Sequence, residues 1–125
     1  MPGNPEFGRL IRHLREEKKK ADPNFSLRRF AEAVDLSATF VSKMETGEYA
    51  PPSHEKIKKM AELLEYDPDE LLALAGKIDP ELGDIIRERS KVLPDLLRSV
   101  RGMSEEDLRL LAEEARKKDD KSKKE

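Results

Sequence analysis

The chain has 125 residues, of which 42% are charged, 36% hydrophobic and 5% aromatic, and its formal net charge is −2. This length suits one small domain with an appendage and leaves little room for a large enclosed cofactor site. No run approaches the ~20 apolar residues of a membrane span, and the first residues lack a signal-peptide pattern. With no cysteine for disulfides, we expect a cytoplasmic protein that makes no membrane contact.

The net charge hides an asymmetry between the two halves of the chain. Residues 1–59 hold 12 Lys and Arg against 9 Asp and Glu, whereas residues 60–125 hold 13 against 18. Only the first half therefore has the sign that suits a phosphate backbone. Because this excess is modest, bulk charge alone is weak evidence for nucleic-acid binding.

The first predicted helix covers residues 6–20. Its apolar side chains follow the i, i+3, i+4, i+7 spacing of one buried stripe, and they are Phe7, Leu10, Ile11 and Leu14. The opposite face is basic. It is either a solvated surface or a source of phosphate contacts, for which Arg12 and Lys20 are candidates.

Residues 26–47 predict two short helices joined by a tight turn. The apolar positions recur at three- or four-residue steps in each half, and they are Leu27, Phe30, Ala31, Val34, Val41 and Met44. Ser26 and Ser37 are suitable N-caps, and Gly47 can adopt the left-handed conformation that ends a helix. Each helix is too short to be stable alone. Their apolar faces must therefore pack together, which is the outline of a helix-turn-helix.

Further helices are predicted downstream. Ser53 caps a fourth, and residues 67–70 open a fifth with an N-cap, a proline at N1 and an acidic N3, which Gly76 ends. Three more amphipathic helices follow, starting near residues 79, 93 and 104. Residues 116–125 contain no apolar side chain, and we predict a disordered charged tail at 118–125.

The helix-turn-helix segment resembles that of the xenobiotic-response-element family, which includes lambdoid phage repressors and Cro proteins. The matching residues are Phe30-Ala31, Val34, Leu36-Ser37, Phe40-Val41-Ser42-Lys43-Met44-Glu45 and Gly47, with Pro52-Ser53 and residues 66–72 downstream. The resemblance covers roughly residues 6–75. Together with the helical periodicity it predicts an all-α fold, with a five-helix, phage-repressor-like domain at 1–77 and a helical extension at 78–117. The apolar faces of that extension either enlarge a monomeric core or form a dimer interface, and we favour the dimer.

The resemblance also implies a DNA-reading helix at residues 37–46. A helix fits the major groove of B-DNA, and residues near its N-terminus lie closest to the base edges. Family members direct the positions of Ala38, Thr39 and Lys43 toward bases and those of Ser37 and Ser42 toward phosphates. The predicted DNA-binding residues are Arg28, Ser37, Ala38, Thr39, Phe40, Ser42, Lys43 and Tyr49.

Four residues in or near the predicted DNA-reading helix have distinct expected roles. Phe40 either packs on a thymine methyl or deoxyribose, or is a partly buried rim residue. Tyr49 is placed to hydrogen-bond a phosphate. Glu45 is expected to anchor the helix by pairing with an arginine. The family usually has a phosphate-gripping glutamine where Leu27 stands, so backbone anchoring here must rest on N–H groups or on the arginines at 28–29.

These features favour a sequence-specific DNA-binding transcriptional regulator, a nucleoid-associated repressor that binds a palindromic site as a homodimer. Two alternatives remain. One is an antitoxin of the same fold whose C-terminal helices bind a toxin, and the other is a protein-interaction adaptor without DNA binding. Nothing favours an enzyme, a cofactor or a metal site, because His13 and His54 are the only histidines and no catalytic or phosphate-loop motif is present.

Overall fold

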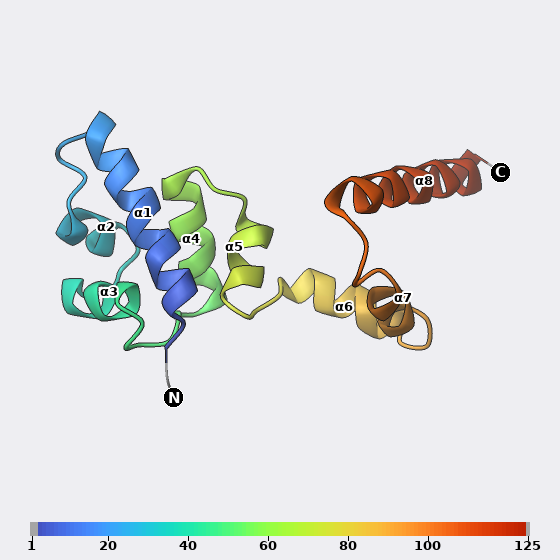
Figure 1. Ribbon diagram of the computed structural model, residues 1–125, viewed down its shortest axis with the longest axis horizontal. Coiled ribbons are helices and arrows are strands. Elements are labelled where there is room, and N and C mark those ends of the chain that lie inside the picture. The colour runs from blue at the N-terminus through green and yellow to red at the C-terminus, as the bar shows by residue number, and fades with distance from the viewer. Residues whose placement is uncertain (1–2, 125) are drawn as a thin grey trace. The chain divides into compact units, whose positions relative to one another are not determined.

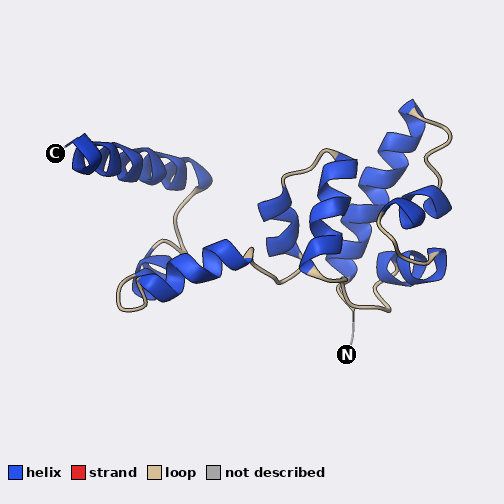
Figure 2. Cartoon of the chain, turned by 180° about the vertical axis from the view of Figure 1, so that it is seen from behind, coloured by secondary structure: helices blue, strands red, loops and turns tan. Residues whose placement is uncertain are grey.

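The computed structural model describes residues 3–124, and within them the chain forms eight helices and no strand (Figure 2). The predicted all-α class is therefore confirmed. The chain divides into two compact units, one ending at Pro80 and one beginning at Glu81. No helix of the described residues is long and apolar enough to cross a membrane.

The first unit contains α1 (Pro5–Ala21), α2 (Leu27–Ala33), α3 (Ala38–Glu45), α4 (His54–Leu64) and α5 (Pro68–Leu74). Helix α1 packs against both α3 and α4, while α2 packs on α3 and α4 packs on α5 (Figure 1). The helix starts agree with the predicted caps, because Ser26, Ser37, Ser53 and Asp67 each accept a hydrogen bond from the backbone N–H three residues later. Gly47 and Gly76 take positive φ angles of 86° and 75°, as predicted for residues that end helices.

One core joins the five helices. Its fully buried side chains include Phe7, Ile11, Phe30, Val34, Val41, Met44, Ile57, Met60, Leu71 and Leu72. Burying each large apolar side chain contributes about 1.5–3 kcal/mol. Every apolar stripe predicted in this part of the chain therefore enters the core, and α3 is held on it by its inner face.

The second unit contains α6 (Pro80–Glu88), α7 (Leu93–Ser99) and α8 (Glu105–Lys124). In contrast to the first unit, no described residue after Leu72 is buried. Its exposed large apolar side chains are Leu82, Ile85, Val92, Leu96, Leu97, Leu108, Leu110 and Leu111. The three amphipathic helices exist as predicted, and within this unit Ile86 and Leu93 are partly buried while the side chains just named are exposed.

The predicted disordered tail at 118–125 is wrong for residues 118–124, which continue α8. Once a helix is nucleated, each added residue gains a backbone hydrogen bond, and Lys is a good helix former. Exposed ion pairs join Lys117 to Glu114 at 3.9 Å and Lys123 to Asp119 at 3.1 Å. The helix therefore extends without apolar side chains. The functional roles assigned to residues 1–77 and 78–117 stay predictions.

Candidate nucleic-acid interface

The turn between α2 and α3 is held by its own backbone and by α4. Asp35 adopts a left-handed conformation with φ of 56°, which Asp tolerates better than most residues that have a Cβ. The N–H of Leu36 donates to the carbonyl of Ala31 at 2.9 Å. Lys56 Nζ, from α4, donates to the carbonyl and the carboxylate of Asp35 at 3.1 and 3.3 Å. These contacts set the angle at which α3 leaves the turn.

A buried ion pair anchors the C-terminal end of α3 to α1. Arg15 Nε and Nη2 donate to the two carboxylate oxygens of Glu45, each at 2.9 Å. The two side chains are only 10% and 5% exposed. The hydrogen bonds that Arg15 donates to Glu45 raise the pKa of Arg15 above its ordinary value, so the arginine stays charged. The prediction that Glu45 pairs with an arginine is therefore confirmed, and the partner is Arg15.

A glycine allows this close approach of the two helices. A Cβ built on Gly8 would lie 2.4 Å from the carbonyl oxygen of Met44 and 2.6 Å from that of Glu45. Real Cβ atoms do not come so close to backbone oxygens, so any other residue would push α3 away from α1. Gly8 was not among the residues predicted to matter, although a glycine inside a helical pattern is itself a signal of close packing.

The outer face of α3 is open to solvent. Thr39 and Ser42 are exposed, while Ala38 and Lys43 are partly exposed. We call these four residues, together with Phe40, the reading face. Phe40 is partly buried and packs against the core, and its contact with DNA stays a prediction.

Three side chains of the predicted site come together at one edge of the reading face. The rings of Phe40 and Tyr49 lie with centroids 5.5 Å apart at 50°, and Lys43 Nζ lies 5.4 Å from the Tyr49 centroid. Tilted aromatic pairs and a cation over a ring are both favourable arrangements. The ammonium group of Lys43 is therefore held near an aromatic surface, and the sequence analysis did not foresee this contact.

The backbone after α3 explains why Tyr49 reaches this edge. The carbonyl of Lys43 accepts from the N–H of Glu48 at 2.9 Å, from the N–H of Tyr49 at 3.2 Å and from Thr46 Oγ1 at 3.0 Å. The chain thus folds back onto the last turn of α3. Thr46 Oγ1 also lies 3.3 Å from the carboxylate of Glu48, which places one negative charge beside the reading face.

The other predicted contacts lie on neighbouring elements. Arg28 is exposed in α2. Ser37 Oγ accepts from the N–H of Phe40 at 3.0 Å, and its hydroxyl proton is still available for donation to a phosphate. The phosphate candidates Arg12 and Lys20 are engaged in exposed ion pairs at 3.0 and 2.8 Å.

Those ion pairs affect the acidic partners on α1. Hydrogen bonds from Arg12 and Lys20 lower the pKa values of Glu16 and Glu17 respectively. Both carboxylates therefore stay negative at neutral pH and offset part of the basic face of α1. Among the described residues, no group of three or more His, Cys, Asp or Glu could hold a metal ion.

Of three comparisons with known proteins, one gives a family. Residues 6–74, more than half of the chain, match the family described as a helix-turn-helix domain. No curated protein sequence matches the chain. Among solved structures, a complex of the SinR and SinI proteins matches 91% of this chain and 98% of its own chain, at 22% sequence identity and a TM-score of 0.46.

Proposed function

Because the chain belongs to the helix-turn-helix domain family, we propose that it is a sequence-specific transcriptional regulator that reads DNA with α3. The observation that carries the proposal is the division of α3 into two faces. Val41, Met44 and Glu45 are buried against the core and against Arg15. The reading face is at least partly exposed and contains two hydroxyl groups, one ammonium group, one small side chain and the phenyl ring of Phe40.

The reading face has suitable chemistry for base edges in the major groove. An ammonium donates to O6 and N7 of guanine, a threonine hydroxyl bonds to several bases, and small apolar groups contact the thymine methyl. We assign these three roles to Lys43, Thr39 and Ala38, respectively. Phe40 and Tyr49 form the apolar edge beside Lys43, and the Tyr49 ring is 5.4 Å from Lys43 Nζ.

Contacts to the phosphate backbone are assigned to Arg28, Ser37, Ser42 and Tyr49. Phosphate contacts fix the register of a protein on the duplex without reading sequence. Leu27 packs against the core and has no group that could bind a phosphate. The N-terminal N–H groups of α3 and the exposed guanidinium of Arg28 therefore take over the backbone role.

We further propose that the regulator acts as a homodimer through its C-terminal helices and represses by occluding a palindromic site. Helix-turn-helix dimers bind half-sites about 34–36 Å apart, and a two-fold protein axis matches a palindrome. The support on the protein side is the row of exposed apolar side chains in the second unit. Such a protein would work in the cytoplasm, on the nucleoid.

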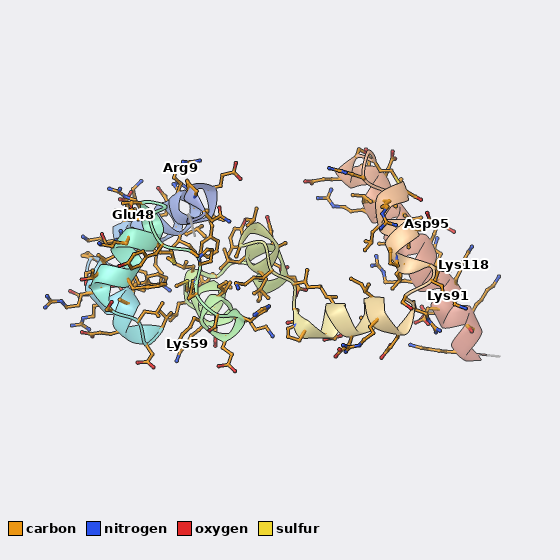
Figure 3. All side chains as sticks on the ribbon, turned by 90° about the horizontal axis from the view of Figure 1, so that it is seen from below. Arg9, Glu48, Lys59, Lys91, Asp95 and Lys118 are labelled. Carbon is orange, nitrogen blue, oxygen red and sulfur yellow. The ribbon has the colours of Figure 1, made fainter. Side chains whose placement is uncertain are left out.

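In-vitro selection from random duplex DNA with the full chain tests this function. We expect enrichment of a palindromic sequence. A matched control is Lys59→Ala, which removes one exposed positive charge from α4 (Figure 3) and should select the same sequence. No enrichment would reject DNA reading in favour of an adaptor, and a single half-site without symmetry would reject the homodimer.

A further inference from the structure

Helix α8 exposes an apolar stripe that no other described helix of the second unit covers. Every side chain from Ser104 to Lys123 is exposed. The stripe recurs at i, i+3, i+4 and i+7, and its members are Leu108, Leu111, Ala112 and Ala115. Asp119 follows on the same face one turn later and ends the stripe. The uncovered surface is therefore short and has a defined centre, between Leu111 and Ala112.

Charge is divided along the same helix. Residues 105–114 carry five acidic side chains and one basic, a net charge of −4. Residues 115–124 carry six basic and two acidic, a net charge of +4. The helix dipole favours acidic residues in the first turn and basic residues in the last. It does not account for Arg116 and Lys118, which lie in the middle of α8.

We propose that α8 pairs antiparallel with α8 of a second copy of the chain, through this stripe. The inference rests on the proposed homodimer and specifies its geometry. A parallel pair would oppose like charges along the whole helix, whereas an antiparallel pair opposes the −4 half to the +4 half. A two-fold axis at the centre of the stripe sets Leu108 opposite Ala115, and Leu111 opposite Ala112, of the second copy.

The charged residues beside the stripe are compatible with this register, because the centres of their two pairs lie one residue to either side of the centre of the stripe. At 100° per residue, Glu105 and Arg116 lie on one flank of the stripe, and Asp107 and Lys118 lie on the other. The two-fold axis keeps each flank against the same flank of the second copy. Glu105 then meets Arg116, and Asp107 meets Lys118, so that four ion pairs border the apolar centre.

These charged side chains are available for such pairing. Among the described residues, Asp107, Arg116 and Lys118 form no ion pair with another side chain. Glu105 has one exposed contact with Arg109, at 3.4 Å. Exposed i, i+4 contacts are weak, so that contact does not prevent Glu105 from pairing with the second copy.

Single cysteines introduced into the full chain report the direction of pairing, because the natural chain contains none. Ala112→Cys lies near the axis and should form a disulfide-linked dimer. A mixture of Leu108→Cys and Ala115→Cys should link 108 to 115, while neither variant should link to itself. Self-linking of each variant, without linking in the mixture, would establish parallel pairing and overturn the inference.

Charge-reversal variants test the proposed ion pairs on the two flanks of the stripe, independently of the cysteine variants. Glu105→Lys with Asp107→Lys should weaken dimerisation on the order of tenfold or more in sedimentation equilibrium, as should Arg116→Glu with Lys118→Glu. The four changes together restore every pair and should restore the dimer. If the combined variant is as weak as its parents, the proposed pairs do not exist.

Leu110 provides a matched control because it lies in α8 but off the stripe. Leu111→Ala should weaken the dimer and Leu110→Ala should not, although both leucines are exposed, at 39% and 53%. A full-length dimer with no linking through Ala112→Cys would overturn the α8 pairing and leave the homodimer standing. A monomer at all concentrations would overturn both proposals.

Discussion

The two units of this chain differ in how far they bury their apolar side chains. In the first unit, five helices bury one continuous core and even enclose an ion pair, Arg15 with Glu45. In the second unit, three helices fully bury no described side chain and leave most of their leucines between 37% and 53% exposed. The helix signals in the sequence are equally clear in both. Amphipathic periodicity therefore predicts a helix and its apolar face, but it does not predict whether that face is buried within the chain or against a partner.

The buried ion pair offers the largest contrast between the units. Glu45→Ala leaves Arg15 charged and buried without its partner, so we expect the free energy of unfolding to fall by about 3–5 kcal/mol. Lys123→Ala removes an exposed ion pair from α8 and should cost less than about 0.5 kcal/mol. Urea denaturation followed by circular dichroism measures both, and equal losses would refute the contrast.

Leucine truncation tests the same contrast in apolar packing. Leu72 is 0% exposed, so Leu72→Ala should lower the free energy of unfolding by about 2–5 kcal/mol. Leu97 is 52% exposed, so Leu97→Ala should change it by less than about 0.5 kcal/mol in dilute solution. A large effect of Leu97→Ala at low protein concentration would mean that the second unit has a core of its own.

Replacing a glycine in each unit compares how closely the backbone is packed there, and the expected effect is smaller. Gly8→Ala places a methyl group against the backbone oxygens of α3, and we expect a loss of about 1–3 kcal/mol. A Cβ added at Gly102, between α7 and α8, would have no heavy atom within 4 Å. Gly102→Ala should therefore leave thermal stability unchanged or slightly higher.

A substitution in the first unit should weaken DNA binding without affecting dimerisation. Lys43→Ala should weaken binding to the selected site by about 1–3 kcal/mol and relax the preference at one base. Its sedimentation as a dimer should be unaffected, because Lys43 lies in the first unit. Unchanged affinity in a fluorescence-anisotropy titration would remove Lys43 from the reading face.

The smallest expected effect concerns the phosphate backbone. If Arg28 contacts a phosphate, Arg28→Ala should reduce the slope of log affinity against log salt by about one unit. The preferred sequence should stay the same, since phosphate contacts do not read bases. A slope equal to that of the unmodified chain would assign backbone anchoring elsewhere.

Local signals predicted the first unit well because they depend on residues close in sequence. The caps at Ser26, Ser37, Ser53 and Asp67, and the glycine stop at residue 47, are short-range hydrogen bonds and backbone conformations. Glu45 was expected to pair with an arginine, but the choice of Arg15 depends on how α1 crosses α3. The contact of Lys56 with Asp35 joins residues 21 apart and left no local signal.

The sequence predicted which residue types lie in the candidate site, but it did not predict how their side chains are arranged. The residue types of the reading face follow from the helix-turn-helix pattern. The contact of Lys43 with Tyr49 depends on how the chain after Gly47 folds back, which spacing does not reveal. The tail was mispredicted because absence of apolar residues prevents burial, whereas extension of an existing helix requires only backbone hydrogen bonds.

The position of Tyr49 also gives the proposed DNA interface an intrinsic fluorescence signal. The chain has no tryptophan and two tyrosines, and the hydroxyl of the other, Tyr66, donates to Glu70 at 2.8 Å. The emission of a tyrosine responds to what touches its ring. In a Tyr66→Phe chain, the intrinsic fluorescence would come from Tyr49 alone, beside Lys43. Titration with unlabelled duplex could then be followed from within the protein, at the edge of α3.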